Sequence, residues 1–121
     1  MISRWTLVFS PQYQDWLQSL EPQQVRAIGR KLELLRMQGP LLGRPHVDHV
    51  KGSQYPNLKE LRITSGSPLH ILFCFDEQRQ GVVLIGGDKS TRNDWYTVTI
   101  QQAEKIFAEH VRSGFKNEES K

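Results

Sequence analysis

Cysteine is almost absent from this sequence, because Cys74 is the only one among 121 residues. A single cysteine cannot form a disulfide within the chain, so the sequence predicts a reducing compartment. Long apolar runs are missing as well, and none approaches the roughly 20 residues that a membrane-spanning helix needs. The N-terminal letters MISRWTLVF lack the apolar region and small-residue cleavage site of a signal peptide. We therefore expect a cytoplasmic protein with no membrane partner.

A strong charge of either sign is also lacking. The formal net charge is +3, the pI is about 9.2, and 37% of the residues are apolar against 24% charged. This composition argues against disorder, and it permits a polyanionic partner without requiring one. The length fits one domain with a small core. We expect this domain to span residues 1–113 and the polar residues 114–121 to form a tail.

Signatures of several enzyme classes are missing. His46 and His49 lie close together, but the surrounding stretch is rich in proline and glycine and has no cysteine, which argues against a zinc site. The letters GGDKS, from Gly86 onward, lack the glycine spacing of a phosphate-binding loop. Nothing supports a serine or cysteine catalytic triad. We therefore expect neither a metal nor a cofactor.

The first third of the chain predicts a strand followed by two helices. Residues 4–10 (RWTLVFS) are rich in aromatic and β-branched side chains, as strands are. Residues 12–20 carry apolar side chains at helical spacing, and a second helix is expected over residues 23–38. Gly39-Pro40 is a strong stop for that helix. The two helices are expected to form a hairpin with a very short connection.

The rest of the chain predicts an antiparallel meander and a last helix. Residues 40–57 are expected to form a long loop, which is either functional or contains short structure. Strands are expected over residues 58–64, 69–76 and 82–88, and a helix over residues 97–113. The strand 69–76 is apolar on both faces, so it belongs in the middle of a sheet.

The expected fold class is therefore α/β of the α+β kind, a single small domain in the order β-α-α-β-β-β-α. An antiparallel sheet forms its core, and the two-helix hairpin packs on one face of that sheet. The other face stays partly open, with the last helix at its edge. A ligand would bind on this open face.

Basic and aromatic residues are expected to gather there. Alternation along residues 58–64 places Glu60 and Arg62 on one face and Lys59 on the other. Arg62 and His70 are expected on neighbouring strands, next to the stretch GGDKSTRNDWY that follows the last strand. Guanidinium groups bind phosphate and aromatic rings stack on unpaired bases, so the cluster suits a polyanion.

The same residues also have a purely structural interpretation. Glu60, taken alone, is a solvated strand charge. Arg62 could pair with Glu60 or Asp88 across the sheet. Trp95 and Tyr96 could anchor a loop on the core. The functional interpretation depends on several of these residues meeting at one place.

Four stretches in this order resemble the RelE/HigB-type toxins of bacterial type II toxin–antitoxin modules, and most of all the phage-derived subgroup of that superfamily. They are GRPHVDHVKGSQYPNLKELRI, LHILFCFD, LIGGDKS followed by WY, and AEKIFAEH. Members of that family are mostly ribosome-dependent endoribonucleases that cut mRNA in the decoding site. The resemblance therefore implies mRNA and the ribosome as partners. It also implies a cognate antitoxin, expected to be a small DNA-binding protein with a helix-turn-helix.

The resemblance further implies which residues act on RNA. The expected catalytic residues are Lys59, Arg62, His70, Lys89 and Tyr96. The expected RNA-binding residues are Arg44, His46, Lys51, Arg92 and Trp95. Relatives usually read YRVLF where this chain reads LHILF, so His70 stands where an arginine is usual.

Cleavage of RNA without a metal needs a base for the ribose 2′-hydroxyl, an acid for the leaving oxygen and cations for the charge on phosphorus. A lysine with a pKa of about 10.4 must be lowered by about three units to act as that base, whereas histidine at about 6.5 needs no such change. His70, His46 or His49 is therefore the expected base. A second hypothesis stays open, in which the protein is a non-enzymatic or decayed relative that binds its antitoxin or poisons DNA gyrase.

Overall fold

The computed structural model describes residues 4–55, 57–63, 68–88 and 94–115. Its elements, in chain order, are β1 (Thr6–Phe9), α1 (Pro11–Gln18), α2 (Pro22–Gln38), the short 3-10 helix η1 (Gly39–Leu41), β2 (Val47–His49), β3 (Lys59–Ile63), β4 (Leu69–Phe75), β5 (Gln80–Asp88) and α3 (Trp95–Ser113). The expected order β-α-α-β-β-β-α is confirmed, with η1 and β2 as additions.

The strands form one sheet in the order β1-β5-β4-β3-β2. The expected meander β3-β4-β5 is antiparallel throughout, and β2 continues it as an antiparallel edge strand. β1 pairs in parallel with β5, a contact that the sequence does not predict. β4 lies in the middle of the sheet, as its two apolar faces predict, and it is buried from Leu69 to Cys74.

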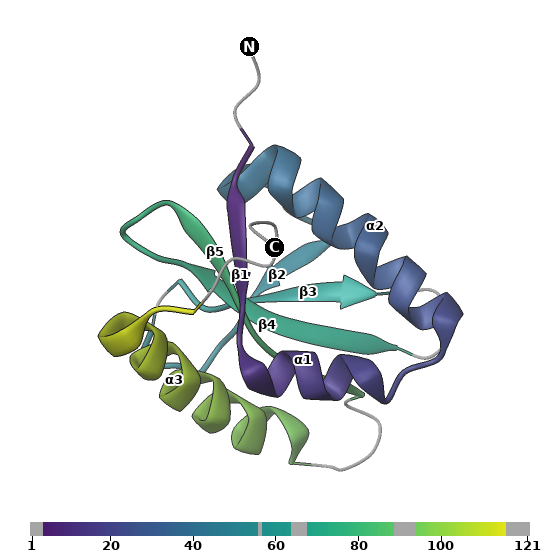
Figure 1. Cartoon of the computed structure of the whole chain (residues 1–121). Coiled ribbons are helices and arrows are strands. Elements are labelled where there is room, and N and C mark those ends of the chain that lie inside the picture. The colour runs from purple at the N-terminus through teal and green to yellow at the C-terminus, as the bar shows by residue number, and fades with distance from the viewer. Residues whose placement is uncertain (1–3, 56, 64–67, 89–93, 116–121) are drawn as a thin grey trace.

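Helices lie on both faces of the sheet (Figure 1). α1 and α2 pack on one face, where their apolar side chains join Leu61, Ile71 and Phe73 in one core cluster. α3 lies on the other face, where Ile100 and Ala103 belong to a second cluster. The expected hairpin on one face is confirmed. In the described part of the chain, no helix has both the length and the apolar character needed to cross a membrane.

A short strand interrupts the segment that the sequence predicts to be a loop. β2 pairs with β3 so that Val47 faces Leu61 and Asp48 faces Glu60. Val47 is buried in the core beneath α2. Of the two alternatives for residues 40–57, the one in which the segment contains short structure is therefore observed, and a strand of three residues is too short to show alternation in the sequence.

The last helix begins earlier than expected. The sequence places Trp95 and Tyr96 in the loop before the helix, but both belong to the first turn of α3. Trp95 is buried, with its indole packed so closely on Gly87 that a Cβ atom there would collide with it. This packing fixes the start of α3 against β5, and it directs Tyr96 toward the sheet.

A β-bulge in β5 precedes two closely packed glycines. A shift in the pairing with β4 leaves Leu84 without a counterpart on that strand. Beyond the bulge, Gly86 faces Trp16 of α1, while Gly87 faces Trp95 of α3, and a Cβ at either position would collide with the indole. The glycines therefore let a tryptophan approach the strand from each side.

Candidate active site

A buried carboxylate lies at the centre of the sheet face that α3 partly covers. Glu60 on β3 is 3% exposed, although it stands in a charged stretch of sequence. It faces Asp48 on β2 and Leu72 on β4. Tyr96 reaches it from the first turn of α3. The expectation of a solvated strand charge is therefore wrong, because distant parts of the chain cover this position.

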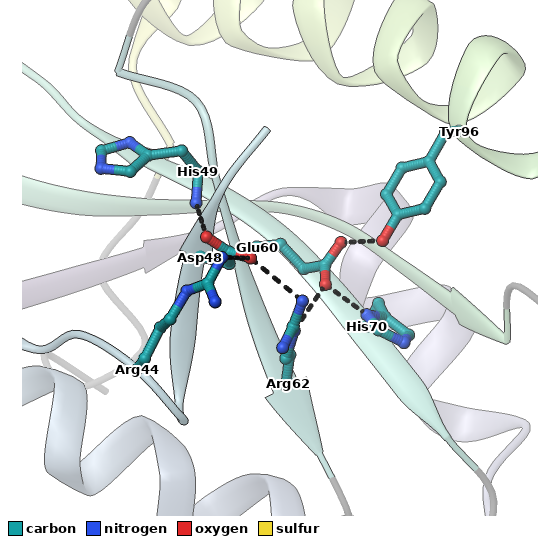
Figure 2. A network of polar contacts seen from close by, with 7 residues as sticks. All are labelled: Arg44, Asp48, His49, Glu60, Arg62, His70 and Tyr96. Atoms are coloured by element: carbon teal, nitrogen blue, oxygen red, sulfur yellow. Dashed lines mark hydrogen bonds and ion pairs between the residues drawn. The ribbon is translucent and has the colours of Figure 1, made fainter. Parts of the chain in front are cut away.

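Three kinds of polar side chain meet the Glu60 carboxylate (Figure 2). The Tyr96 hydroxyl donates a hydrogen bond to Oε1. The Nε of Arg62 donates to Oε2 at 3.1 Å, and Nδ1 of His70 lies 2.7 Å from the same oxygen. Of the two structural alternatives for Arg62, pairing with Glu60 is the one observed. A phenol, a guanidinium and an imidazole thus share one buried anion.

These contacts set the protonation states of Glu60 and Tyr96. Burial by itself raises the pKa of Glu60, but the contacts with His70, Tyr96 and Arg62 outweigh it and lower the pKa to about 2. Burial, and then the hydrogen bond to the Glu60 carboxylate, raise the pKa of Tyr96 above its ordinary value. At neutral pH, Glu60 is therefore an anion and Tyr96 a neutral hydrogen-bond donor.

His70 lies beneath the aromatic residues of α3. It is the direct cross-strand partner of Arg62, as alternation predicts. The residue is 5% exposed, and its ring centroid lies 6.0 Å from that of Trp95 and 6.5 Å from that of Tyr96. Its Nδ1 faces Glu60 at ion-pair distance, but the angle is not that of a hydrogen bond. Packing against these two rings holds the imidazole beside the Glu60 carboxylate.

A second carboxylate extends the network toward solvent. Oδ2 of Asp48 accepts hydrogen bonds from Nη2 of Arg44 at 3.0 Å and from Nη2 of Arg62 at 3.1 Å. Its Oδ1 accepts the backbone N–H of His49 at 2.9 Å. This N–H, with the neighbouring guanidinium groups, holds the pKa of Asp48 below its ordinary value. Arg62 therefore bridges two carboxylates, Glu60 and Asp48.

The network brings several of the expected site residues together. Those that contact Glu60, Asp48 or one another are Arg44, Arg62, His70, Trp95 and Tyr96. Lys51 lines a shallow cleft of about 470 Å³ beside Tyr96, between the β2–β3 loop and α3. Lys89 and Arg92 lie outside the described residues.

Two of the expected site residues lie on the other side of the sheet. Nζ of Lys59 is 5.7 Å from the ring centre of Phe75, which packs against the cluster beneath α1 and α2. Nδ1 of His46 is 2.7 Å from Nζ of Lys31 on α2. Lys59 directly precedes Glu60, so strand alternation turns the two side chains to opposite faces. Lys59 and His46 therefore do not join Arg62 and His70.

Sequence reasoning misses the two carboxylates that organise the network. A signal for Glu60 is nonetheless present, because it lies on the strand next to 69–76, whose two faces are apolar. A carboxylate beside such a strand is buried, and a buried carboxylate needs partners. Asp48 has no comparable signal, since it stands on the short strand hidden in residues 40–57.

A separate polar pair lies near the end of α3. Nε2 of His110 is 2.8 Å from Oδ2 of Asp76, and Nδ1 of His110 accepts the backbone N–H of Phe115 at 3.1 Å. His110 is buried, so it serves packing and local hydrogen bonding. Among the described residues, no group of three or more His, Cys, Asp or Glu side chains is placed to hold a metal ion.

Comparisons with known sequences relate this chain to a family. The profile described as "Phage derived protein Gp49-like (DUF891)" matches residues 15–108. HigB3 of Mycobacterium tuberculosis, described as a candidate toxin, is 39% identical over 100 residues, which cover 82% of this chain and 87% of HigB3. HigB2 of the same organism, also described as a candidate toxin, is 41% identical over 99 residues, which cover 79% of this chain. That match spans 49% of HigB2, so the chain spans about half the length of this relative.

Comparisons with solved structures concern the fold. The toxin RelE of E. coli, a mutant form in the free state, superposes with a TM-score of 0.62 at 14% identity, covering 84% of this chain and 96% of that one. The YoeB dimer of Staphylococcus aureus gives a TM-score of 0.54 at 20% identity, covering 69% and 94%. A chain of the archaeal RelE–RelB complex from Pyrococcus horikoshii gives a TM-score of 0.56 at 15% identity, covering 74% of this chain and 99% of that one. These similarities show that the fold is shared.

Proposed function

This chain belongs to the phage-derived Gp49-like family, and from that membership we propose that the protein is the toxin of a type II toxin–antitoxin module. The descriptions of HigB2 and HigB3 as toxins support this function, and so does the fold shared with RelE and YoeB. We place the toxin domain in residues 1–113, with residues 114–121 as a polar tail.

The proposed activity is cleavage of mRNA on the ribosome by an endoribonuclease that uses no metal. The observation that carries it is the Glu60 network, which holds an imidazole, a guanidinium and a phenol on one sheet face. In such a reaction the ribose 2′-oxygen loses its proton and bonds to the adjacent phosphorus. The bond from phosphorus to the 5′-oxygen breaks and this oxygen takes up a proton from a general acid or from water, which leaves a 2′,3′-cyclic phosphate and a 5′-hydroxyl.

The protonation states of Glu60 and Tyr96 support the following roles. Glu60, with a pKa of about 2, is too weak a base at neutral pH, and Tyr96 stays protonated. His70 is therefore the group that moves the proton among the described members of the network, and Glu60 orients its ring. Arg62 binds the phosphate, and Tyr96 donates a hydrogen bond to a phosphoryl oxygen.

The reaction requires the site to open. His70 is 5% exposed, whereas the Arg62 side chain and Tyr96 are each 37% exposed. RNA therefore meets Arg62 and Tyr96 first. The imidazole reaches the ribose once the half-exposed Tyr96 ring has shifted, while Trp95 stays packed against Gly87.

Further contacts with RNA and with partners complete the proposal. We expect RNA to contact residues around the network, namely Arg44, Lys51, Arg92 and Trp95. Catalytic roles for Lys59 and Lys89, and RNA binding by His46, stay predictions of the family resemblance. The partners proposed are the ribosome, mRNA and a cognate antitoxin, in the cytoplasm. A RelE–RelB complex is known for the archaeal relative, which supports an antitoxin here.

Induced expression in a bacterium tests the proposal. We expect growth arrest, relief of that arrest by a small DNA-binding protein encoded beside the toxin, and new 5′ ends in translated mRNA mapped by primer extension. The same mRNA without ribosomes should stay intact. Strong expression that leaves growth and translation unchanged would contradict the toxin function. Growth arrest without mRNA cleavage would favour the gyrase-poisoning alternative.

A further inference from the structure

Two arginines of the site share one carboxylate oxygen. Oδ2 of Asp48 accepts Nη2 of Arg44 at 3.0 Å and Nη2 of Arg62 at 3.1 Å. Figure 2 shows these side chains converging from β2, from β3 and from the segment before β2. Guanidinium groups bind carboxylate and phosphate oxygens with the same fork geometry. The oxygen of Asp48 therefore stands where a non-bridging phosphate oxygen would be bound equally well.

We propose that Arg44 and Arg62 form a binding site for one phosphodiester of RNA, and that the Asp48 carboxylate occupies this site in the free protein. The inference rests on the proposed function, because RNA is the polyanion that this function supplies. Asp48 acts as an internal competitor, and RNA binds as this carboxylate leaves the two guanidinium groups.

The two carboxylates that hold Arg62 differ in how readily they can leave. Glu60 has a side chain that is 3% exposed, and it is also held by Tyr96 and His70. Asp48 has a side chain that is 21% exposed, on an edge strand of three residues, and its second partner Arg44 is 76% exposed. Exposed ion pairs contribute little to stability, so this contact exchanges easily. Arg62 stays anchored through Nε to Glu60 while its Nη2 turns from Asp48 to phosphate.

Charge makes the competition measurable. In the free protein Arg44 and Arg62 are balanced by Asp48 and Glu60, so these side chains carry no net charge together. A phosphate that enters must do so beside the displaced carboxylate of Asp48, which repels it. Asp48→Asn keeps the shape of the side chain and removes this charge. We therefore expect the removal of an acidic residue from the site to strengthen RNA binding without any new contact.

The experiment measures the affinity of a short fluorescent RNA with 2′-O-methyl riboses, which cannot be cleaved, in the absence of ribosomes. Asp48→Asn should bind about three to ten times more tightly than the wild type. Asp15→Asn is the matched control, because it makes the same change in net charge on α1, on the other side of the sheet. It should stay within about 1.5-fold of the wild type. Adding Arg44→Gln to Asp48→Asn should abolish the gain.

Equal affinities for Asp48→Asn and Asp15→Asn, or weaker binding by Asp48→Asn, would overturn the proposal. A measurement on the wild type keeps the proposal testable even if Asp48→Asn fails to fold. The arginine side-chain NMR signals of Arg44 and Arg62 should shift together when this RNA is added, while that of Arg79, which lies over Trp5, stays in place. Shifts that spare Arg44 and Arg62 would overturn it.

The outcome is independent of the proposed cleavage, because this binding needs neither a ribosome nor a reaction. If the wild type binds RNA through Arg44 and Arg62 but never cuts mRNA, the enzymatic function is contradicted and the phosphate-binding site still holds. If the wild type cuts mRNA but Asp48→Asn does not bind RNA more tightly, the enzymatic function holds and Asp48 is not an internal competitor.

Discussion

Arg62 and His70 face each other across β3 and β4, and both contact the same oxygen, Oε2 of Glu60, at 3.1 and 2.7 Å. One buried carboxylate therefore positions both the guanidinium that would bind the phosphate and the imidazole that would move the proton. A substitution at Glu60 changes the surroundings of both groups together, so the variants of these residues must be compared as a set.

Glu60→Gln should remove part of the pH dependence of stability. The pKa of Glu60 is lowered from 4.5 to about 2 in the folded protein, so its ionised form favours folding above pH 4.5 and this contribution is lost as the pH falls toward 2. The difference corresponds to about 3 kcal/mol. Urea unfolding of both proteins at a series of pH values from 7 to 2 measures it.

Asp76 also has a lowered pKa and lies outside the network, so it makes stability depend on pH equally in both proteins. The difference between the two curves therefore reports Glu60 together with Asp48, which shares Arg62 with it. We expect the wild type to lose its advantage over Glu60→Gln between pH 4.5 and 2. Parallel curves over that range would show that the Glu60 carboxylate gains nothing from its partners.

Arg62→Ala should lower mRNA cleavage by about a hundredfold, because it removes a cation from the charge that develops on phosphate. It should also lower the free energy of unfolding by about 1–3 kcal/mol, since a buried carboxylate loses a charged hydrogen-bond donor. Arg30→Ala is the control, as an exposed position on α2. Cleavage is measured as initial rates on ribosome-bound mRNA, and stability by urea unfolding.

Lys59→Ala tests whether the active site lies on the face of the sheet that carries Arg62 or includes the opposite face. Its side chain lies over Phe75 on the face opposite Arg62, so the geometry predicts a rate within a few-fold of the wild type. A loss as large as that of Arg62→Ala would mean that the role implied by the family resemblance is correct. The site would then include the strand edge beside Phe75.

His70→Gln should slow single-turnover cleavage by about two to four decades. Glutamine has no group that can accept the proton of the ribose 2′-hydroxyl, so the variant keeps the polar side chain and loses the base. His70→Arg restores the residue usual in relatives, and it should keep phosphate binding. A single-turnover rate of His70→Gln within a few-fold of the wild type would make His70 a passive strand residue and move the search for the base to residues 44–51.

Gly87→Ala should destabilise the protein by about 1–3 kcal/mol, because the added Cβ collides with the indole of Trp95. It should also lower cleavage, since Trp95 sets the start of the helix that carries Tyr96. Gly29→Ala is the matched control, because its Cβ would meet nothing within 4 Å on α2. It should stabilise the protein by about 0.5–1 kcal/mol. Thermal unfolding of the two variants should show shifts of opposite sign.

Most of the fold can be predicted because its signals are local. Pro11 and Gly39 mark where helices begin and end, and the apolar spacing between such marks is long enough to identify the elements. The central place of β4 follows from its own side chains. The parallel pairing of β1 with β5 could not be predicted in this way. It joins Thr6 to Gln80, and neither segment has a feature that identifies the other as its partner.

The site is less predictable because its chemistry depends on contacts between distant segments. The alternation of β3 and β4 suffices to bring Arg62 opposite His70. The burial of Glu60, however, requires Tyr96 from α3, 36 positions later, and the neutralisation of Arg62 requires Asp48, 14 positions earlier. A residue that looks like a solvated charge in its own strand thus becomes the centre of the network.

The bulge at Leu84 has a consequence for how this fold can change in length during evolution. Leu84 has no counterpart on β4, so losing it would leave the faces of the neighbouring residues unchanged. An insertion or deletion between Ile85 and Asp88 would instead exchange the sides on which Gly86 and Gly87 meet their tryptophans, and would carry Tyr96 away from Glu60. Among descendants of this sequence, length variation in β5 should therefore be confined to the bulge.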